Sequence, residues 1–290
     1  MITRPILLGL CTMMLSIYAS GCSTTSTSPQ SPSAQKSHEG YSIQQRQARV
    51  ATKEAPSFVG GNESDVRSPK PLTLSELRRK YRSHFIMQGP SDEKRVALTF
   101  DDVPDNHFTP QVLDVLRNYG VKATFFVVGN RAEKYPEIMM RILEEGHIVG
   151  NHSYDHPNLP KLSNEAFHNE ILRTQNILRA AAGRTINFIR PPYGNISEEQ
   201  IKWLASQHML IVNWNVDSLD WKGLTAEQIE ANIMSHLTPG AIVLQHAAGG
   251  KNHDLNGTVK ALPYIIEELN RQGIEMVTLD KLLSKPAYRE

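Results

Sequence analysis

The chain has 290 residues, is 40% hydrophobic and 21% charged, and carries a formal net charge of +1. That length and apolar content suffice for one good-sized core, and they suit a single α/β barrel with an N-terminal extension. The near-neutral balance, with no basic stripe or groove-reading motif, argues against a nucleic-acid-binding protein, so we expect no nucleic-acid partner.

The N-terminus has the order of a secretory signal peptide. Arg4 precedes the apolar run Ile6 to Leu15, which is too short to span a membrane. The small residues directly before Cys22 resemble a bacterial lipobox, although Ala19 stands where Leu is usual. We therefore predict that residues 1–22 form a lipoprotein signal peptide and that Cys22 is lipidated. An ordinary signal peptide with a chance cysteine is the alternative.

Cysteine usage agrees with lipidation. Cys11 lies inside the predicted signal peptide, so Cys22 is the only cysteine left after processing and no intramolecular disulfide can form. We expect an exported bacterial lipoprotein that faces the cell wall and meets the membrane only through its lipid anchor.

Two segments separate this anchor from the folded domain. Residues 23–71 are rich in Ser, Thr and Pro and poor in aromatic residues, which predicts a flexible tether. Residues 72–93 follow as a short helical extension, because Leu74, Leu77 and Tyr81 recur at helical spacing behind Thr73, a suitable N-cap.

From Arg95 onward, short apolar strands alternate with amphipathic helical patterns, as in βα units around a parallel sheet. The predicted strands lie near 95–100, 122–128, 147–150, 187–190, 209–214, 241–245 and 274–277. The predicted helices lie near 109–118, 131–145, 163–182, 197–207, 225–236 and 257–271. A closed or nearly closed barrel is the architecture that this alternation favours, with its chemistry at the carboxyl ends of the strands.

Polar clusters follow the predicted strands repeatedly and should therefore converge at one end of the barrel. These clusters are Asp101-Asp102, His152 to His156, Arg190 to Gly194, Asp217 to Trp221, and His246.

Two of these clusters suggest a metal site. Asp101 and Asp102 are adjacent like charges at the end of a strand, which a chain keeps where a cation or a reaction needs them, although a solvated turn is the plainer interpretation of such a pair. The i, i+4 spacing of His152 and His156 places two imidazoles on one side of a helical turn. With one carboxylate they make a three-ligand set that leaves a position open for water, as catalytic zinc sites do. Alone, such a histidine pair is more often found on a helix surface than at a metal site.

Taken together and in order, the five clusters resemble the motifs of the polysaccharide deacetylases, carbohydrate esterase family 4 with the NodB homology domain. The resemblance covers about residues 94–283 and is strongest to bacterial peptidoglycan N-acetylglucosamine deacetylases. It implies a distorted (β/α) barrel of seven to eight strands and metal-dependent removal of N-acetyl groups from amino sugars.

The resemblance also implies the roles at the metal. Asp102, His152 and His156 match the metal ligands, while Asp101 matches the general base that takes a proton from the metal-bound water. Arg190 matches the residue that holds Asp101 ionised. One divalent metal is implied; the ligand set suits Zn²⁺, and Co²⁺ or Ni²⁺ accept the same ligands.

The remaining implied roles concern the departing amine and the substrate pocket. His246 matches the general acid that protonates the leaving amine, and Asp220 matches the carboxylate that orients it. The backbone N–H of Tyr193 matches an oxyanion donor, with Pro191 and Pro192 fixing that backbone. Trp221 and Leu244 match the walls of the acetyl pocket, although Trp221 would equally suit core packing.

Two positions depart from the family pattern. Val103 replaces the usual glycine after the acid pair, so its backbone should avoid positive φ. Ala247 follows His246 where many members carry Asp, which leaves Asp220 to orient the acid.

The sequence thus predicts a hydrolase that removes N-acetyl groups from GlcNAc residues of cell-wall peptidoglycan. One alternative is a deacetylase of another glycan: chitin oligomers, an exopolysaccharide, xylan, or the muramic position of peptidoglycan. The other is a catalytically silent wall-binding lipoprotein.

Overall fold

The computed structural model describes residues 71–250 and 253–290. The predicted signal peptide, its Cys22 and all but the last residue of the predicted tether lie outside the described residues. Within the described ranges, no helix is long and apolar enough to cross a membrane.

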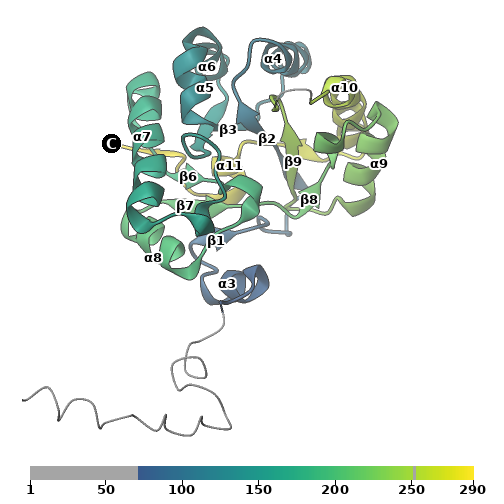
Figure 1. Cartoon of the computed structure of the whole chain (residues 1–290). Coiled ribbons are helices and arrows are strands. Elements are labelled where there is room, and N and C mark those ends of the chain that lie inside the picture. Colours follow the sequence, from purple (N-terminus) through teal and green to yellow (C-terminus); the bar gives the residue numbers. More distant parts are fainter. Residues whose placement is uncertain (1–70, 251–252) are drawn as a thin grey trace, which may run out of the picture. The chain divides into compact units, whose positions relative to one another are not determined.

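A curved parallel sheet forms the centre of the domain (Figure 1). Its eight-strand path runs β1 (Phe85–Ile86), β7 (Leu210–Val212), β6 (Phe188–Ile189), β4 (Ile148–Asn151), β3 (Thr124–Val127), β2 (Arg95–Val103), β9 (Ile242–His246) and β8 (Val216–Asp217). A ninth strand, β10 (Glu275–Met276), pairs with the start of β2. Because β1 and β8 end the path without pairing to each other, the barrel is open on that side. The prediction of a distorted (β/α) barrel is confirmed.

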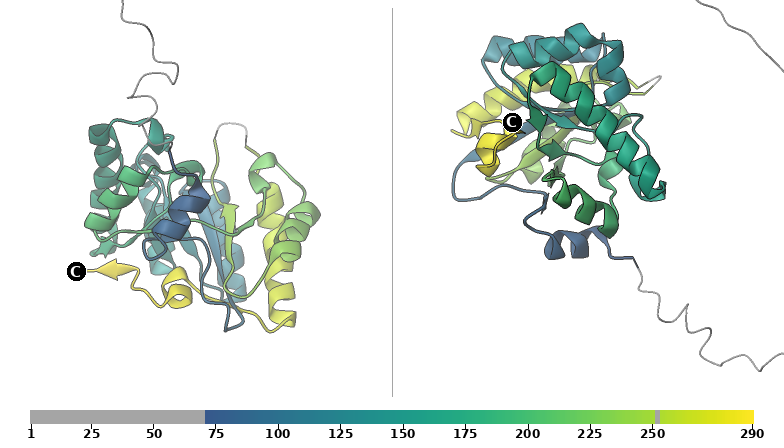
Figure 2. Two further views of the ribbon diagram at one scale, coloured as in Figure 1. Left: turned by 90° about the horizontal axis from the view of Figure 1, so that it is seen from below. Right: turned by 90° about the vertical axis from the view of Figure 1, so that its left-hand side faces the viewer.

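Helices pack against this sheet (Figures 1 and 2). They are α3 (Leu74–Lys80), α4 (Phe108–Tyr119), α5 (Gly129–Lys134), α6 (Pro136–Glu144), α7 (Asn164–Ala182), α8 (Glu198–Ser206), α9 (Ala226–His236), α10 (Asn256–Arg271) and α11 (Leu279–Leu283). Those of the described ranges cover the outer side of the sheet except α11, whose Leu279 and Leu282 pack with Ala97 on the opposite face. Three 3₁₀ turns lie at Leu159–Lys161, Pro192–Gly194 and Asp220–Lys222. A separate antiparallel pair joins β5 (Thr185–Ile186) to β11 (Tyr288–Arg289).

Strand β2 shows how the core is built on both faces of the sheet. Leu98 and Phe100 are fully buried in one apolar cluster with Leu113 of α4 and Leu262 of α10. Ala97, between Leu98 and Val96 in the sequence, belongs to a second cluster. Alternate strand residues face opposite sides, so a strand buried on both sides must be apolar at nearly every position. That requirement explains the continuous apolar run that precedes the acid pair.

The predicted elements agree with the structure except where elements are very short or interrupted. β1, β5, β8 and β11 are two residues long each and carry no periodic signal. The helix predicted over 131–145 is two helices, because Pro136 occupies the first turn of α6, where its missing N–H has no partner to lose. Thr73 caps α3 as the pattern predicts, with a reciprocal bond to Glu76.

The segment 72–93 contributes to the sheet as well as to a helix. After α3, Phe85 and Ile86 pair in parallel with Ile211 and Val212 of β7. Phe85 is almost fully buried, so this edge strand closes part of the core.

Candidate active site

The carboxyl ends of the central strands surround a pocket of about 560 Å³. Its walls include eight of the residues singled out from the sequence: Asp101, Asp102, His152, His156, Tyr193, Trp221, Leu244 and His246. Asp101 on β2 and His246 on β9 are direct register partners in adjacent strands. The convergence expected from the strand-end rule is therefore present.

Both carboxylates reach this pocket because β2 is irregular at its end. In a regular strand, adjacent side chains would point to opposite faces. Here the pairing with β3 shifts register between Phe100 and Val103, and Asp102 has a φ of 68°. The bulge turns Asp102 to the same side as Asp101. The positive φ thus falls on Asp102 itself and not on Val103, in agreement with the expectation for that valine.

Asp102, His152 and His156 form a compact set of three possible metal ligands. Their ligand atoms all lie within 4.8 Å of one another. The Asp102 Oδ1 atom lies 3.4 Å from His152 Nε2 and 3.2 Å from His156 Nε2. The two imidazole centroids are 5.0 Å apart. The three side chains therefore present two nitrogens and one oxygen toward a common point.

The histidines are brought together by a loop, so the prediction of a helical turn is wrong. Residues 152–156 follow β4 without helical hydrogen bonding, and Ser153 and His156 have positive φ values of 63° and 59°. The Ser153 hydroxyl accepts a 3.1 Å hydrogen bond from the His156 N–H, which fixes the turn locally. The left-handed conformations, and not helical spacing, place the two rings side by side.

The environment of these three side chains fits a divalent cation. The Nδ1 atom of His152 lies 2.7 Å from the carbonyl oxygen of Arg190, so the Nδ1–H donates and the Nε2 lone pair faces the pocket. The Oδ1 atom of Asp102 is buried without a hydrogen-bond partner among the described residues. Although burial opposes it, the neighbouring His152 and His156 imidazoles lower the pKa of Asp102 well below its ordinary value. An ionised, unpartnered oxygen beside two imidazoles is a donor set suited to Zn²⁺ or a similar ion.

An acid on a neighbouring helix braces the histidine loop. The Glu170 Oε2 atom, from α7, accepts hydrogen bonds from the backbone N–H groups of Tyr154 (2.8 Å) and Asp155 (2.9 Å). Glu170 lies well outside the motif in sequence, so no local spacing could have identified it. Its carboxylate holds the segment between the two histidines from outside the pocket.

Asp101 is paired with a fully buried arginine. Arg190 NH1 donates a 2.7 Å hydrogen bond to Asp101 Oδ1 and a 2.8 Å bond to the hydroxyl of Thr99. Arg190 Nε donates to the carbonyl oxygen of Val212, and the guanidinium lies 4.1 Å from the centroid of Phe126. The guanidinium is thereby fixed in orientation, with its positive charge directly beside the Asp101 carboxyl group.

We expect Arg190→Leu to lower the free energy of unfolding by about 3–5 kcal/mol, because it leaves Asp101 as a buried unpaired charge. Urea unfolding followed by circular dichroism measures this loss. Arg173→Leu is the matched control, since Arg173 is 56% exposed in its ion pair with Glu133 and should contribute less than about 1 kcal/mol. Equal losses in the two variants would contradict a special role for the buried pair.

A second acid–base pair lies across the pocket. His246 Nδ1 is 2.7 Å from Asp220 Oδ1, while Asp220 Oδ2 accepts from the His246 backbone N–H and from the Thr258 hydroxyl, both at 2.8 Å. Burial alone would lower the pKa of His246, but the charge and hydrogen bond of Asp220 outweigh it and raise that pKa to about 9. His246 therefore holds its proton at neutral pH, with Nε2 free to present it to the pocket.

The residues matched to the oxyanion and acetyl positions line the same pocket: Tyr193 and Trp221 at its rim, and Leu244 in its wall. Tyr193 is 62% exposed with a φ of 59°, and its ring lies 4.8 Å from that of His156. Pro191 and Pro192 are buried beneath it. Leu244 is buried in the pocket wall, whereas Trp221 is 46% exposed at the rim, so the core-packing alternative for this tryptophan is wrong.

Arg131 is a pocket residue that the sequence reasoning assigned only to a helix. Its guanidinium donates to the carbonyl oxygens of Asp102 (2.9 Å) and Gly249 (2.8 Å). Arg131 follows β3 at the same end of the sheet as the other clusters, so the strand-end rule could have found it. Thr258, which fixes Asp220, gives no comparable signal because it lies inside α10.

Three curated relatives show what this chain resembles. It is 46% identical to a peptidoglycan-N-acetylglucosamine deacetylase of Bacillus cereus, over 71% of this chain and 74% of that protein. It is 41% identical to the peptidoglycan-N-acetylglucosamine deacetylase PgdA of Listeria monocytogenes, over 65% of this chain and 39% of that protein. It is 36% identical to the peptidoglycan-N-acetylmuramic acid deacetylase PdaC of Bacillus subtilis, over 76% of this chain and 47% of that protein. The chain thus spans less than half the length of the last two.

A family model and a solved structure agree with these relatives. Residues 88–211 match the model described as polysaccharide deacetylase. A crystal structure of a peptidoglycan N-acetylglucosamine deacetylase, in complex with a naphthalenyl N-oxidanyl-benzamide, superposes with a TM-score of 0.72 at 44% identity. That superposition covers 75% of this chain and all of the other.

Proposed function

Because this chain belongs to the polysaccharide deacetylase family, whose members are hydrolases of N-acetyl amide bonds, we propose that it deacetylates GlcNAc residues of peptidoglycan. The observation that carries the proposal is the joint presence, in one pocket, of the Asp102, His152 and His156 set and two separate acid–base pairs. Metal-dependent hydrolysis of an amide uses all three: a cation, a base for water and an acid for the amine.

The first requirement is met by the three-ligand set. Asp102, His152 and His156 would hold one divalent cation, for which we propose Zn²⁺, with Co²⁺ and Ni²⁺ as ions that the same ligands accept. When bound, such a cation polarises the amide carbonyl and makes water more acidic. The His152 ring is held by the Arg190 carbonyl, which leaves its Nε2 in the ligating tautomer.

Asp101 is the base in this proposal. Its Oδ1 is held by Arg190, and its Oδ2 lies 3.7 Å from His152 Nε2, on the side of the ligand set. The free oxygen is therefore directed to the place where an attacking water would stand. Because one oxygen is fixed by the guanidinium, the other can accept the proton without rotating away.

His246 is the acid in this proposal. Amide cleavage expels a poor leaving group, so the nitrogen must gain a proton as the carbon–nitrogen bond breaks. His246 carries that proton at neutral pH because Asp220 stabilises the imidazolium. Asp101 and His246 are register partners on adjacent strands, which places base and acid on two sides of one substrate position.

The acetyl group and its oxygen are assigned to the opposite wall. We infer that the Tyr193 backbone N–H donates to the developing oxyanion, with Pro191 and Pro192 restricting the backbone before it. Leu244 and Trp221 would line the acetyl methyl, since both belong to the pocket wall.

We expect activity to be sustained up to about pH 9 and to fall above it, because His246 must be protonated to act as the acid. Asp220→Asn removes the charge that raises this pKa, so the alkaline limb should move toward or below the ordinary histidine value of 6.5. The measurement is the pH dependence of kcat for acetate release. Thr258→Val is the matched control, because it removes one hydrogen bond to Asp220 and keeps the Asp220 carboxylate. The alkaline limb of the kcat profile should therefore move little in this variant. An unchanged alkaline limb in Asp220→Asn would remove His246 from the role of acid.

Acetate release tests the reaction and the substrate together. The purified protein is incubated with peptidoglycan, N-acetylchitooligosaccharides or acetylxylan, each with a chelator and then with Zn²⁺ or Co²⁺ restored. We expect metal-dependent release from peptidoglycan, and mass spectrometry of the muropeptides to place the free amine on glucosamine. Release from muramic residues would favour the alternative that the Bacillus subtilis relative exemplifies. Failure on every glycan with metal bound would favour a silent wall-binding protein.

We propose that the enzyme acts outside the cell as a lipoprotein. The support is the sequence alone: residues 1–22 as a signal peptide, Cys22 as the lipidated residue, residues 23–71 as a tether, 72–93 as an extension and 94–283 as the deacetylase domain. Mass spectrometry of the mature N-terminus tests this, and an unmodified Cys22 in the exported protein would contradict it.

A further inference from the structure

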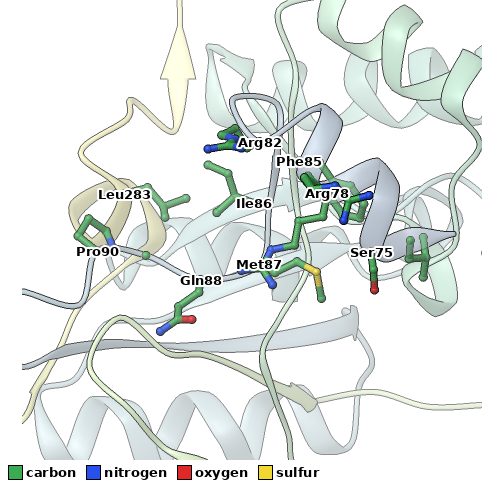
Figure 3. A pocket seen from close by; sticks show the side chains of 12 residues that line it. Ser75, Arg78, Arg82, Phe85, Ile86, Met87, Gln88, Pro90 and Leu283 are labelled. Carbon is green, nitrogen blue, oxygen red and sulfur yellow. The ribbon is translucent and has the colours of Figure 1, made fainter. Parts of the chain in front are cut away.

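A second pocket, of about 760 Å³, lies between α3, β1 and α11 and shares no residue with the catalytic pocket (Figure 3). Its apolar lining residues include Phe85, Ile86, Met87 and Leu283. Its lining also includes three arginines, Arg78, Arg79 and Arg82. Figure 3 shows Arg78 and Arg82 beside the apolar side chains of the strand that follows them.

These arginines are a concentration of charge that the described part of the chain does not neutralise. Among residues 71–250 and 253–290, no ion pair involves Arg78, Arg79 or Arg82, whereas the neighbouring Lys80 pairs with Glu198 at 2.6 Å. Glu76 lies close enough to Arg79 to feel its charge, but its carboxylate already binds the N–H and hydroxyl of Thr73.

The three arginines lie at the end of α3 and just after it. Arg78 and Arg79 are in the last turn of the helix, and Arg82 is in the turn that follows. Like charges gathered at one pocket repel one another, and an anion in the pocket would remove that repulsion.

The combination of arginines and apolar side chains in this lining points to a phosphate-bearing amphiphile as the ligand. Guanidinium groups match phosphate oxygens in shape and charge, and several together are favoured over single lysines. A purely hydrophilic anion would leave Ile86, Met87 and Leu283 without a partner. We propose that this pocket binds the phosphate head groups of an anionic membrane surface, which goes beyond the proposed deacetylation.

The point at which the chain enters the domain favours a membrane as the occupant. Residue 71 leads directly into α3, and Leu74 and Ser75 of that helix line the pocket. The 70 preceding residues, with Cys22 among them, therefore join the domain at this pocket. A lipid attached to Cys22 and a basic surface at the point of attachment would be two membrane signals on one chain.

The part of the pocket formed by Gly89 and Leu283 lies toward the amino ends of the strands. The Gly89 N–H bonds the carbonyl of Gly240, just before β9, and Gln88 bonds that of Pro239. In α11, which contributes Leu283, the Leu279 N–H bonds Thr124 at the start of β3. By contrast, α3, which carries Arg78 and Arg79, is bonded through Lys80 to Glu198, the first residue of α8, which follows the carboxyl end of β6. The pocket therefore extends along the side of the barrel and does not lie at one end of it.

Vesicle co-sedimentation tests the proposal. The mature chain, residues 22–290, carrying Cys22→Ser so that it cannot be lipidated, is mixed with phosphatidylcholine vesicles with and without phosphatidylglycerol. A basic side chain near an anionic surface contributes roughly fivefold, so Arg78→Gln, Arg79→Gln and Arg82→Gln together should weaken partitioning roughly 100-fold. The matched control neutralises three exposed cations elsewhere, Lys161→Gln, Arg179→Gln and Arg184→Gln, and should bind nearly as the parent does. Met87→Ser should weaken binding without changing its salt dependence.

Three results would overturn the proposal. Equal losses in the two triple variants would show that net charge alone drives binding. Unchanged binding in the arginine variant, with an unchanged unfolding temperature, would remove the pocket from membrane contact. Arginine-dependent binding to a soluble glycerol-phosphate polymer but not to vesicles would assign the pocket to an anionic wall polymer.

Discussion

Asp101→Asn is expected to lower the rate of acetate release about a thousandfold while the metal content stays unchanged. A positioned general base contributes typically 10² to 10⁴ in rate, and an amide cannot accept the proton from water. Asp101 is placed apart from the ligand set by its bond to Arg190, whereas Asp102 Oδ1 lies against both imidazoles. The measurement pairs kcat with metal analysis of the same preparation.

Two comparisons make this result specific. The asparagine oxygen can still accept from Arg190, so urea unfolding should show whether lost activity comes from lost structure. Asp114→Asn, at an exposed position on α4, should leave the rate unchanged. Asp102→Asn should lose metal as well as turnover, which would separate the two adjacent acids by their roles. A variant of Asp101 with full activity would remove it from the position of base.

The strand-end rule is what made this pocket predictable from the sequence. Asp101, Arg190 and His246 are far apart in the chain, yet each lies at or just after the carboxyl end of a strand of the same parallel sheet. In such a sheet, all carboxyl ends lie at one edge, so residue order and strand order together determine which side chains meet. Applied to β3 as well, the same rule would have predicted that Arg131 lies in the pocket.

The exact directions of side chains were not predictable in this way. Period-two alternation predicts that the Asp101 and Asp102 side chains point to opposite faces of the sheet. The bulge that turns both to the same side depends on a positive φ at Asp102, which the sequence does not predict. Helical spacing predicted that His152 and His156 lie side by side, which they do, but the cause is a loop in which Ser153 and His156 adopt left-handed conformations. Local patterns identify which residues gather, but tertiary packing sets their φ and ψ angles.

Supporting residues were missed for a related reason. Glu170 binds the histidine loop from α7, and Thr258 binds Asp220 from α10. Each lies inside an amphipathic helix, where a single polar residue looks like any other on a helix surface. Their roles arise from contacts between elements, which periodicity cannot report.

His156→Ala is expected to lose both bound metal and turnover, so that acetate release falls to the rate of the chelator-treated enzyme. Removing one of three protein ligands leaves two, too few to hold a catalytic zinc ion against water. His156 contributes more than a nitrogen, because its ring lies between His152 and Tyr193 at centroid distances of 5.0 and 4.8 Å. Metal content by mass spectrometry and acetate release on one preparation test both losses.

The protonation state of His156 adds a second measurement. Burial, helped by the neighbouring His152, lowers the pKa of His156 to about 4, so the ring is neutral and free to ligate well below neutral pH. Metal binding should therefore persist into mildly acidic solution in the parent protein and be absent from His156→Ala at every pH. His236→Ala, an exposed histidine at the end of α9, is the matched control and should keep both metal and activity. Unaltered metal content in His156→Ala would remove this residue from the ligand set, and the cation site would then have to be rebuilt around Asp101, Asp102 and His152.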